Sequence, residues 1–203
     1  MKKLLSSKNI NTPGEYAKSY FRYLNEILST IDVKQIDKLV KLLLKLRSQG
    51  KTIFVIGNGG SSATATTMAN DIGFDIIKKT KTEKAFKVLS LNDNTSVLTA
   101  ISNDVGYEEV FMNQLKIHYK TGDALIVISA SGNSKNLIKA SKFVKSKKGK
   151  VVAFLGFDGG KLSRICDIQI HVKTNEGEYG PTEDAHLIIN HILAHWFQGT
   201  ISS

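Results

Sequence analysis

The stretch VIGNGGSSATATTMANDIGFD, residues 55–75, runs from an apolar segment through a turn of glycines and serines into residues of helical character. The preceding residues KTIF, 51–54, extend the apolar segment into a short run rich in β-branched residues, which is typical of a strand buried on both faces. Glycines let backbone N–H groups approach a ligand closely, and the start of a helix favours negative charge. The stretch therefore predicts a strand, an anion-binding turn and a helix, in that order.

The same unit recurs along the chain. Four more apolar runs predict strands, each separated from the next by helical material: residues 86–91, 123–129, 150–157 and 167–172. Strands that alternate with helices favour a parallel sheet covered on both faces. The sequence therefore predicts an α/β fold with a doubly wound, five-stranded parallel sheet in a three-layer arrangement.

Helices are also predicted before and after the sheet. Apolar residues recur at helical spacing between residues 13 and 48, which predicts a pair of helices, the second capped by Asp32 and ended by Gly50. Residues 182–197 predict a final helix, with Thr182 as its N-terminal cap.

Composition narrows the class of protein. A chain of 203 residues, 41% hydrophobic and 23% charged, fits one globular domain. Its net charge of +10 would suit nucleic acid, a membrane surface or small anions, but the lysines are scattered without interleaved aromatic residues, which argues against nucleic-acid binding.

Residues 1–16 lack a signal-peptide core, and no run approaches a membrane span. A single cysteine, Cys166, suits a reducing compartment, so we expect a cytoplasmic protein in which this thiol is buried and inert.

A second loop of small hydroxyl residues follows the third predicted strand, SASGNS at residues 129–134. Because the carboxyl ends of parallel strands meet at one edge of a sheet, this loop and the glycine turn at residues 57–62 are expected to share a phosphate site. Neither the dinucleotide fingerprint nor the nucleotide P-loop is present, and one such loop alone would more often be an ordinary tight turn. Two loops at equivalent strand ends favour a shared anion site.

The motifs of the chain resemble those of the sugar isomerase (SIS) domain family, most closely its phosphoheptose isomerase branch. Five of them occur in the family's order and spacing: GNGGSS (57–62), TAISNDVGYEEVF (99–111), ISASGNSKNLIKA (128–140), GFDGGKLSRICD (156–167) and EDAHLIINHIL (183–193). The resemblance covers nearly the whole chain and implies a single flavodoxin-like SIS domain over residues 1–203. It also implies a homotetramer with active sites at subunit interfaces, in which residues 1–50 pack on the domain and contribute to the interface.

The resemblance implies a set of substrate-binding residues. These are Asn58, Gly59, Gly60, Ser61, Asn103, Asp104, Ser129, Ala130, Ser131, Ser134 and Glu183. Ala130 stands where the family commonly has a hydroxyl, so one phosphate donor is missing here. Asn103 and Asp104 have a simpler alternative role, which is to cap the helix expected to begin near Tyr107.

Interconversion of a ketose and an aldose moves a proton between C1 and C2 and needs a base, an acid and an electrophile. The resemblance implies that His191 is the base and that Asp71 and Glu183 exchange protons with the substrate oxygens. A lone histidine in an apolar helix is more often a core residue, and that alternative stays open for His191. His186 could serve a neighbouring subunit's site, His195 is expected to pack or meet a neighbour, and His118 and His171 have no assigned role.

Many members of the family hold a zinc ion, and its ligand positions correspond to Thr67, Asp71, Glu183 and His191. Thr67 replaces an imidazole by a neutral hydroxyl, which is a poor zinc ligand. Asp71, Glu183 and His191 could still hold zinc with water in the fourth position, so a zinc site and a metal-free site both stay open.

The expected function is that of a phosphosugar isomerase that converts sedoheptulose 7-phosphate to D-glycero-D-manno-heptose 7-phosphate for surface-polysaccharide heptose synthesis. One alternative is a non-catalytic SIS protein that binds a sugar phosphate or a protein partner, which Thr67 would favour. Another is an isomerase of a different sugar phosphate in a capsule or O-antigen pathway.

Overall fold

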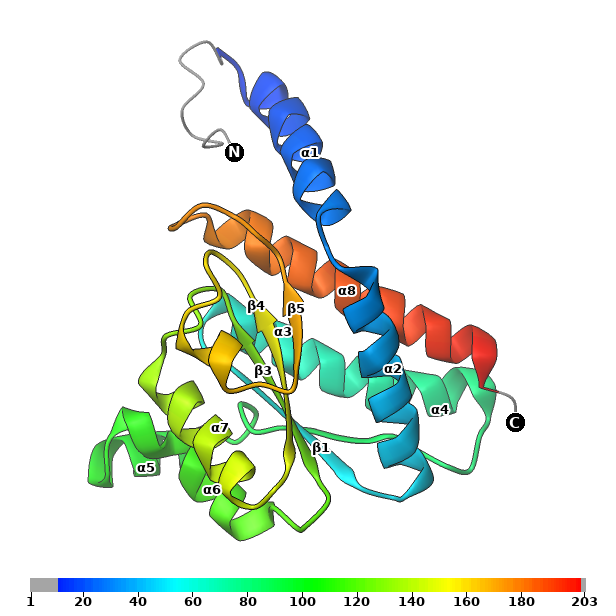
Figure 1. Ribbon diagram of the computed structural model, residues 1–203, viewed down its shortest axis with the longest axis vertical. Helices are drawn as coiled ribbons and strands as arrows, with labels where there is room; N and C mark the ends of the chain where they lie inside the picture. The colour runs from blue at the N-terminus through cyan, green and yellow to red at the C-terminus, as the bar shows by residue number, and fades with distance from the viewer. Residues whose placement is uncertain (1–10, 202–203) are drawn as a thin grey trace.

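The computed structural model describes residues 11–201 and contains a five-stranded, all-parallel sheet in the order β2-β1-β3-β4-β5 (Figure 1). The predicted α/β fold is therefore confirmed, and the strand order is that of flavodoxin-like sheets. The strands are β1 (Thr52–Gly57), β2 (Lys87–Ser90), β3 (Ala124–Ser129), β4 (Lys150–Leu155) and β5 (Ile168–His171).

Helices cover both faces of the sheet (Figure 1). One face carries α2 (Val33–Ser48), α3 (Gly60–Met68), α4 (Asp75–Thr80) and α8 (Tyr179–Thr200). The other face carries α5 (Thr95–Asp104), α6 (Val110–His118) and α7 (Lys135–Ser146). Shorter helical turns connect these elements: η2 (Ala69–Phe74), η3 (Tyr107–Glu109) and η4 (Lys161–Arg164).

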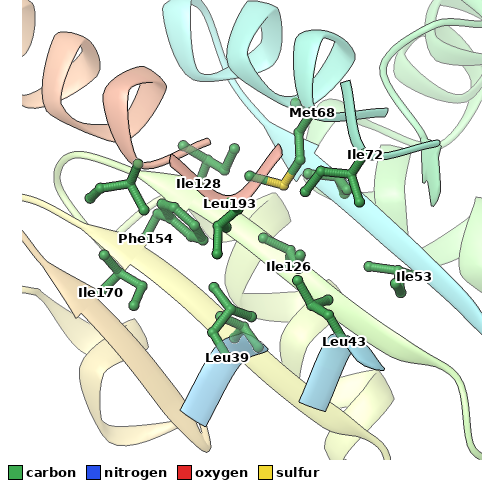
Figure 2. Close-up of a cluster of buried hydrophobic side chains, with 14 of the residues drawn as sticks. Leu39, Leu43, Ile53, Met68, Ile72, Ile126, Ile128, Phe154, Ile170 and Leu193 are labelled. Carbon is green, nitrogen blue, oxygen red and sulfur yellow. The ribbon is translucent and has the colours of Figure 1, made fainter. Parts of the chain in front are cut away.

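The core forms two layers because successive strand residues point to opposite faces of the sheet. In β3, Ile126 and Ile128 pack with Leu39, Leu43 and Leu193 beneath α2 and α8, as Figure 2 shows. The alternate residues of β3 belong to the layer beneath α6 and α7. Burial on both faces explains why the strands read as continuous apolar runs in the sequence.

The N-terminal helix pair forms as predicted within the described residues. Asp32 caps α2 by accepting a hydrogen bond from the backbone N–H of Lys34 at 3.0 Å. The helix ends at Ser48, and Gly50 takes a φ of +63°, a conformation that suits glycine. The preceding helix α1 (Pro13–Ser29) projects beyond the rest of the molecule (Figure 1). Two predictions also involve residues 1–10, namely that they belong to the N-terminal segment and that they lack a signal-peptide core. These residues lie outside the ones that the structure describes.

The prediction that Thr182 caps the last helix is wrong. Helix α8 begins three residues earlier, at Tyr179, with Glu178 in the capping position. Thr182 is fully buried in the first turns, where its hydroxyl donates to the backbone carbonyl of Glu178 at 2.8 Å. A threonine hydroxyl can bond to the carbonyl four residues back inside a helix as readily as it can cap one, and the sequence pattern does not separate the two.

Several surface lysines are paired with carboxylates. Lys139 contacts Glu108 and Glu109 at 2.5 and 2.6 Å, and Lys145 contacts Asp167 at 2.8 Å. Exposed pairs of this kind contribute little to stability. Within residues 11–201, no helix combines the length and the apolar character that a bilayer crossing requires.

Candidate functional site

The two loops predicted to share a site lie side by side at the carboxyl edge of the sheet. Their strands are neighbours, with Gly57 of β1 in register with Ile128 of β3. Together with the start of α8 they enclose a pocket of about 130 Å³. It is lined by Asn58, Ser61, Ile128, Ser129, Ala130, Ser131, Ser134, Leu137, Tyr179 and Glu183.

The serine loop is built so that its hydroxyl groups stay available. The backbone N–H groups of Gly132 and Asn133 donate to the hydroxyl oxygens of Ser129 and Ser131, at 3.1 and 3.3 Å. Each of these hydroxyls therefore keeps its own proton to donate to a ligand. Ser134 occupies the N-cap position of α7, yet its side chain makes no capping hydrogen bond. Three hydroxyl donors and the positive end of a helix thus converge, which is an arrangement suited to a phosphate group.

A close contact between loops holds the serine loop in place. Gly132 has a φ of +62°, and a Cβ built on it would lie 2.1 Å from the carbonyl oxygen of Gly159. Any side chain at position 132 would therefore push the serine loop away from the loop that follows β4.

Glu183 lies at the rim of the pocket, over the first turn of α3. A Cβ built on Gly60 would lie 2.3 Å from the Oε2 atom of Glu183, so glycine leaves the space that this carboxyl group uses. Burial raises the pKa of Glu183, and the nearby charge of Asp184 raises it further. A carboxyl group with a raised pKa beside a phosphate cradle is suited to exchange protons with a bound ligand.

A second group of polar side chains gathers farther along α8. His191 Nε2 lies 3.6 Å from Asp71 Oδ2, an ion-pair distance when the ring is protonated. The amide of Asn190 donates to the same carboxylate oxygen at 2.7 Å, and the amide of Asn70 donates to Asp71 Oδ1 at 3.1 Å. The side chain of His191 is 53% exposed and that of Asp71 is 15% exposed, so the imidazole is open to a ligand.

Asp71 lies in η2, where the chain follows a π-helical path from Ala69 to Phe74. Thr67 and Asp71 are four residues apart, a spacing that would place them on one face of a continuous α-helix. The α-helix ends at Met68, however, and this was not evident from the sequence. Turns of this kind are rare and occur often at functional sites.

The pair formed by Asp71 and His191 is separate from the serine pocket within one chain. Neither residue lines that pocket, whereas Glu183 does. Glu183 and His191 are eight residues apart on α8, which is about 12 Å along the helix axis. The structure thus brings Asp71 to His191 and Glu183 to the serine loop.

Asn103 and Asp104 lie exposed at the end of α5 and do not line the serine pocket. The amide of Asn103 donates to the carboxylate of Asp104 at 2.8 Å, and the following turn η3 has Gly106 in its capping position. The alternative that these two residues cap the next helix is therefore wrong, because Val105 and Gly106 separate them from it.

The partners of the Asn58 side chain were not predicted from the sequence. Its side chain exchanges hydrogen bonds with Asn136 at 3.0 and 2.9 Å and accepts one from the hydroxyl of Tyr107 at 2.8 Å. Both partners lie inside the quoted motifs, so their position was a usable signal. Tyr179 also lines the pocket, but no local pattern marks it.

The residues at the expected zinc positions do not fit a metal ion. Over residues 11–201, no three histidine, cysteine, aspartate or glutamate side chains gather as a metal site requires. One oxygen of Asp71 already accepts the amide of Asn190, and Thr67 offers a neutral hydroxyl.

The other histidine and cysteine candidates do not line the serine pocket. His186 is fully buried against Phe154 and donates through Nε2 to the carbonyl of Leu155 at 3.1 Å, and burial lowers its pKa to about 4. It is a neutral core residue of its own subunit, so the expectation that it serves a neighbouring site is wrong. His195 is exposed beside Trp196. Cys166 is half-buried rather than fully buried, and burial raises the pKa of its thiol, which keeps it protonated.

Known proteins resemble this chain in sequence and in fold. The family model described as the SIS domain matches residues 15–156. A phosphoheptose isomerase from Aneurinibacillus thermoaerophilus is 35% identical over 191 residues, covering 89% of this chain and 91% of that protein. One from Helicobacter pylori is 40% identical over 149 residues, covering 73% and 74%. The solved phosphoheptose isomerase of Neisseria gonorrhoeae aligns with a TM-score of 0.80 and 28% identity, covering 93% of this chain and all of that one.

Proposed function

This chain belongs to the SIS domain family and, within it, to the phosphoheptose isomerases, and from that premise we propose that it interconverts sedoheptulose 7-phosphate and D-glycero-D-manno-heptose 7-phosphate. The observation that carries the proposal is the pocket in which three serine hydroxyls meet a carboxyl group of raised pKa. The product would supply heptose for surface polysaccharide. Because sugar phosphates of this kind are made and used in the cytoplasm, the proposal includes a cytoplasmic location.

The phosphate group binds to Ser129, Ser131 and Ser134 at the start of α7. This anchor orients the rest of the sugar, since interactions with the unreactive end lower the entropic cost of aligning the reactive end. Asn58 to Ser61 line the sugar, and Asn103 with Asp104 are proposed to contact its hydroxyls. A sugar whose carbon chain extends along α8 from Glu183 points toward His191.

Side chains near C1 and C2 of the sugar are proposed to carry out the proton transfer. His191 removes the C1 proton of the ketose, and the carboxylate of Asp71 stabilises the resulting imidazolium, which returns the proton to C2. Within one chain Glu183 lies about 12 Å along α8 from His191, so the Glu183 that acts here is proposed to come from a neighbouring copy of the chain. It exchanges protons with the substrate oxygens, so that O2 gains a proton while O1 loses one and becomes the aldehyde oxygen. Hydrogen bonds and fixed dipoles stabilise the enediolate between the two steps.

The active form is proposed to be a homotetramer. Helix α1 projects from the domain with Phe21 67% exposed, and Trp196 on α8 is 55% exposed. An apolar groove of about 370 Å³ between α2 and α8 is lined in part by Ile36, Val40, Ile192 and Trp196. Apolar surface of this kind favours contact with further copies of the chain. Light scattering on the purified protein would give the oligomeric state directly.

The function is tested by incubating the purified protein with sedoheptulose 7-phosphate and with other ketose phosphates, with and without added zinc, and following aldose formation. We expect turnover of the heptulose phosphate, unchanged by zinc. Turnover of a different ketose phosphate alone would favour the capsule or O-antigen alternative. Binding of sugar phosphates without any turnover would contradict the enzyme and favour a non-catalytic SIS protein.

A further inference from the structure

A buried amide lies directly beside the proposed base. Asn190 precedes His191 on α8 and is 0% exposed. Its Nδ2 atom donates to Asp71 Oδ2 at 2.7 Å, and this is the same oxygen that lies 3.6 Å from His191 Nε2. The buried amide and the exposed imidazole therefore meet at one carboxylate oxygen.

The other end of the Asn190 side chain is unsatisfied. Its Oδ1 atom is buried and has no hydrogen-bond partner among residues 11–201. An unpaired carbonyl oxygen in a core lowers stability, and an apolar side chain of similar size would avoid that loss. Ile189, Leu193 and Ala194, which are buried near Asn190 on α8, are apolar, whereas His186 one turn earlier is a second buried polar residue. A buried amide with one unsatisfied atom indicates a role for its other atom. That atom is Nδ2 of Asn190, which donates to Asp71.

The carboxylate of Asp71 is held from both sides. Asn190 binds Oδ2 from α8, and Asn70 binds Oδ1 from the adjacent position in the π-helical turn η2. Asn70 belongs to the same turn as Asp71 and moves with it. Asn190 is on a different helix, so its amide ties the carboxylate to the helix that carries His191.

We propose that Asn190 is a positioning residue, which holds the carboxylate of Asp71 in the orientation that supports His191 during proton transfer. It does not touch the substrate and acts through Asp71. The inference rests on the proposed isomerase function, because that function makes His191 the base.

The first test measures turnover of sedoheptulose 7-phosphate by Asn190→Leu. The change removes the amide but keeps the volume, so we expect kcat to fall about 10- to 100-fold, with KM nearly unchanged. The same substitution in an Asp71→Asn background should cause no further loss of kcat, because the carboxylate that Asn190 positions is already absent. Equal losses of kcat in both backgrounds, or wild-type kcat in Asn190→Leu, would overturn the proposal.

A matched control is Gln114→Leu. Gln114 is a buried amide on α6 that donates to the carbonyls of Leu91 and Val110, at 3.1 and 3.0 Å, on the opposite face of the sheet. We expect this variant to keep wild-type kcat even if its stability falls. A loss of kcat equal to that of Asn190→Leu would show that removing any buried amide is enough, and the positioning role would be rejected.

A second measurement does not depend on activity. The urea midpoints of wild type, Asn190→Leu, Asp71→Asn and the double variant form a double-mutant cycle, and we expect non-additive shifts because the two side chains are hydrogen-bonded. Additive shifts would overturn the inference. If the wild type turned over no sugar phosphate, the proposed function would be rejected, together with the role of Asn190 in proton transfer. The double-mutant cycle would still decide whether Asn190 holds Asp71.

Discussion

The carboxyl group of Glu183 lies against Gly60, so closely that a Cβ built on the glycine would lie 2.3 Å from Glu183 Oε2. This contact joins the start of α8 to the start of α3 and closes one side of the serine pocket. Because the carboxyl group is partly buried there, its pKa is raised. A local packing relationship thus gives the pocket a group that can carry a proton.

Replacing Glu183 by glutamine tests the role of that proton. Glu183→Gln fits the same space but cannot ionise, so we expect kcat for sedoheptulose 7-phosphate to fall about 100-fold, with KM little changed. Steady-state kinetics would measure both constants. Wild-type turnover would instead mean that this side chain only forms hydrogen bonds with the sugar.

The same variant should also change how stability depends on pH. The pKa of Glu183 is raised above its ordinary 4.5, so the folded chain holds this proton more tightly than the unfolded chain. That contribution to stability is complete below about pH 4.5 and is lost as the pH rises through the folded pKa. We therefore expect wild type to lose stability relative to Glu183→Gln as the pH rises, in urea unfolding across this range. Parallel curves for the two proteins would contradict the raised pKa.

His191→Ala separates catalysis from binding. The variant lacks the proposed base, and we expect kcat to fall at least about 100-fold. The serine loop is untouched, so calorimetry should show phosphate-ester affinity close to that of wild type. Turnover that survives this change would remove His191 from the mechanism, and His195→Ala on the exposed part of the same helix serves as the control.

Ser134→Ala tests the phosphate cradle. Because the Ser134 side chain makes no capping bond, its loss should leave the unfolding free energy nearly unchanged. A hydrogen bond from its hydroxyl to a charged phosphate is worth about 1.5–3 kcal/mol, so we expect affinity to weaken at least about tenfold. Ser48→Ala, which removes an exposed hydroxyl bonded to the carbonyl of Lys45, is a control expected to leave affinity unaltered. A large loss of stability in Ser134→Ala would show that the hydroxyl supports the fold.

His186 should make the protein sensitive to acid. Burial lowers its pKa from 6.5 to about 4, so its contribution to stability is present above pH 6.5 and is lost as the pH falls toward 4. The shift corresponds to about 3 kcal/mol. His186→Gln should flatten the loss of unfolding free energy over that range, whereas His195→Gln, at an exposed position, should not. If both variants lose stability as wild type does, other groups govern acid unfolding.

The sequence by itself determined the order of strands and helices, the position of the two glycine and serine loops at the ends of β1 and β3, and the family. These features depend on patterns within a few residues: β-branched apolar runs form strands buried on both faces, and glycines with serines form turns that precede helices. Asp32 and Gly50 were correct as helix boundaries for the same reason. Thr182 was not, because a threonine near the start of a helix can cap it or bond within it.

The tertiary structure alone decided which polar groups meet. Asn190 reaches Asp71 across 119 positions of sequence, and Tyr107 reaches Asn58 across 49. The first contact depends on how the π-helical turn η2 packs beside α8, where one more residue per turn redirects the side chain of Asp71. The second depends on how η3 lies beside the loop that follows β1. No local pattern encodes that packing. The sequence therefore predicted the residues of the site, whereas the packing of two helices divided them into a serine pocket with Glu183 and a separate pair of Asp71 and His191.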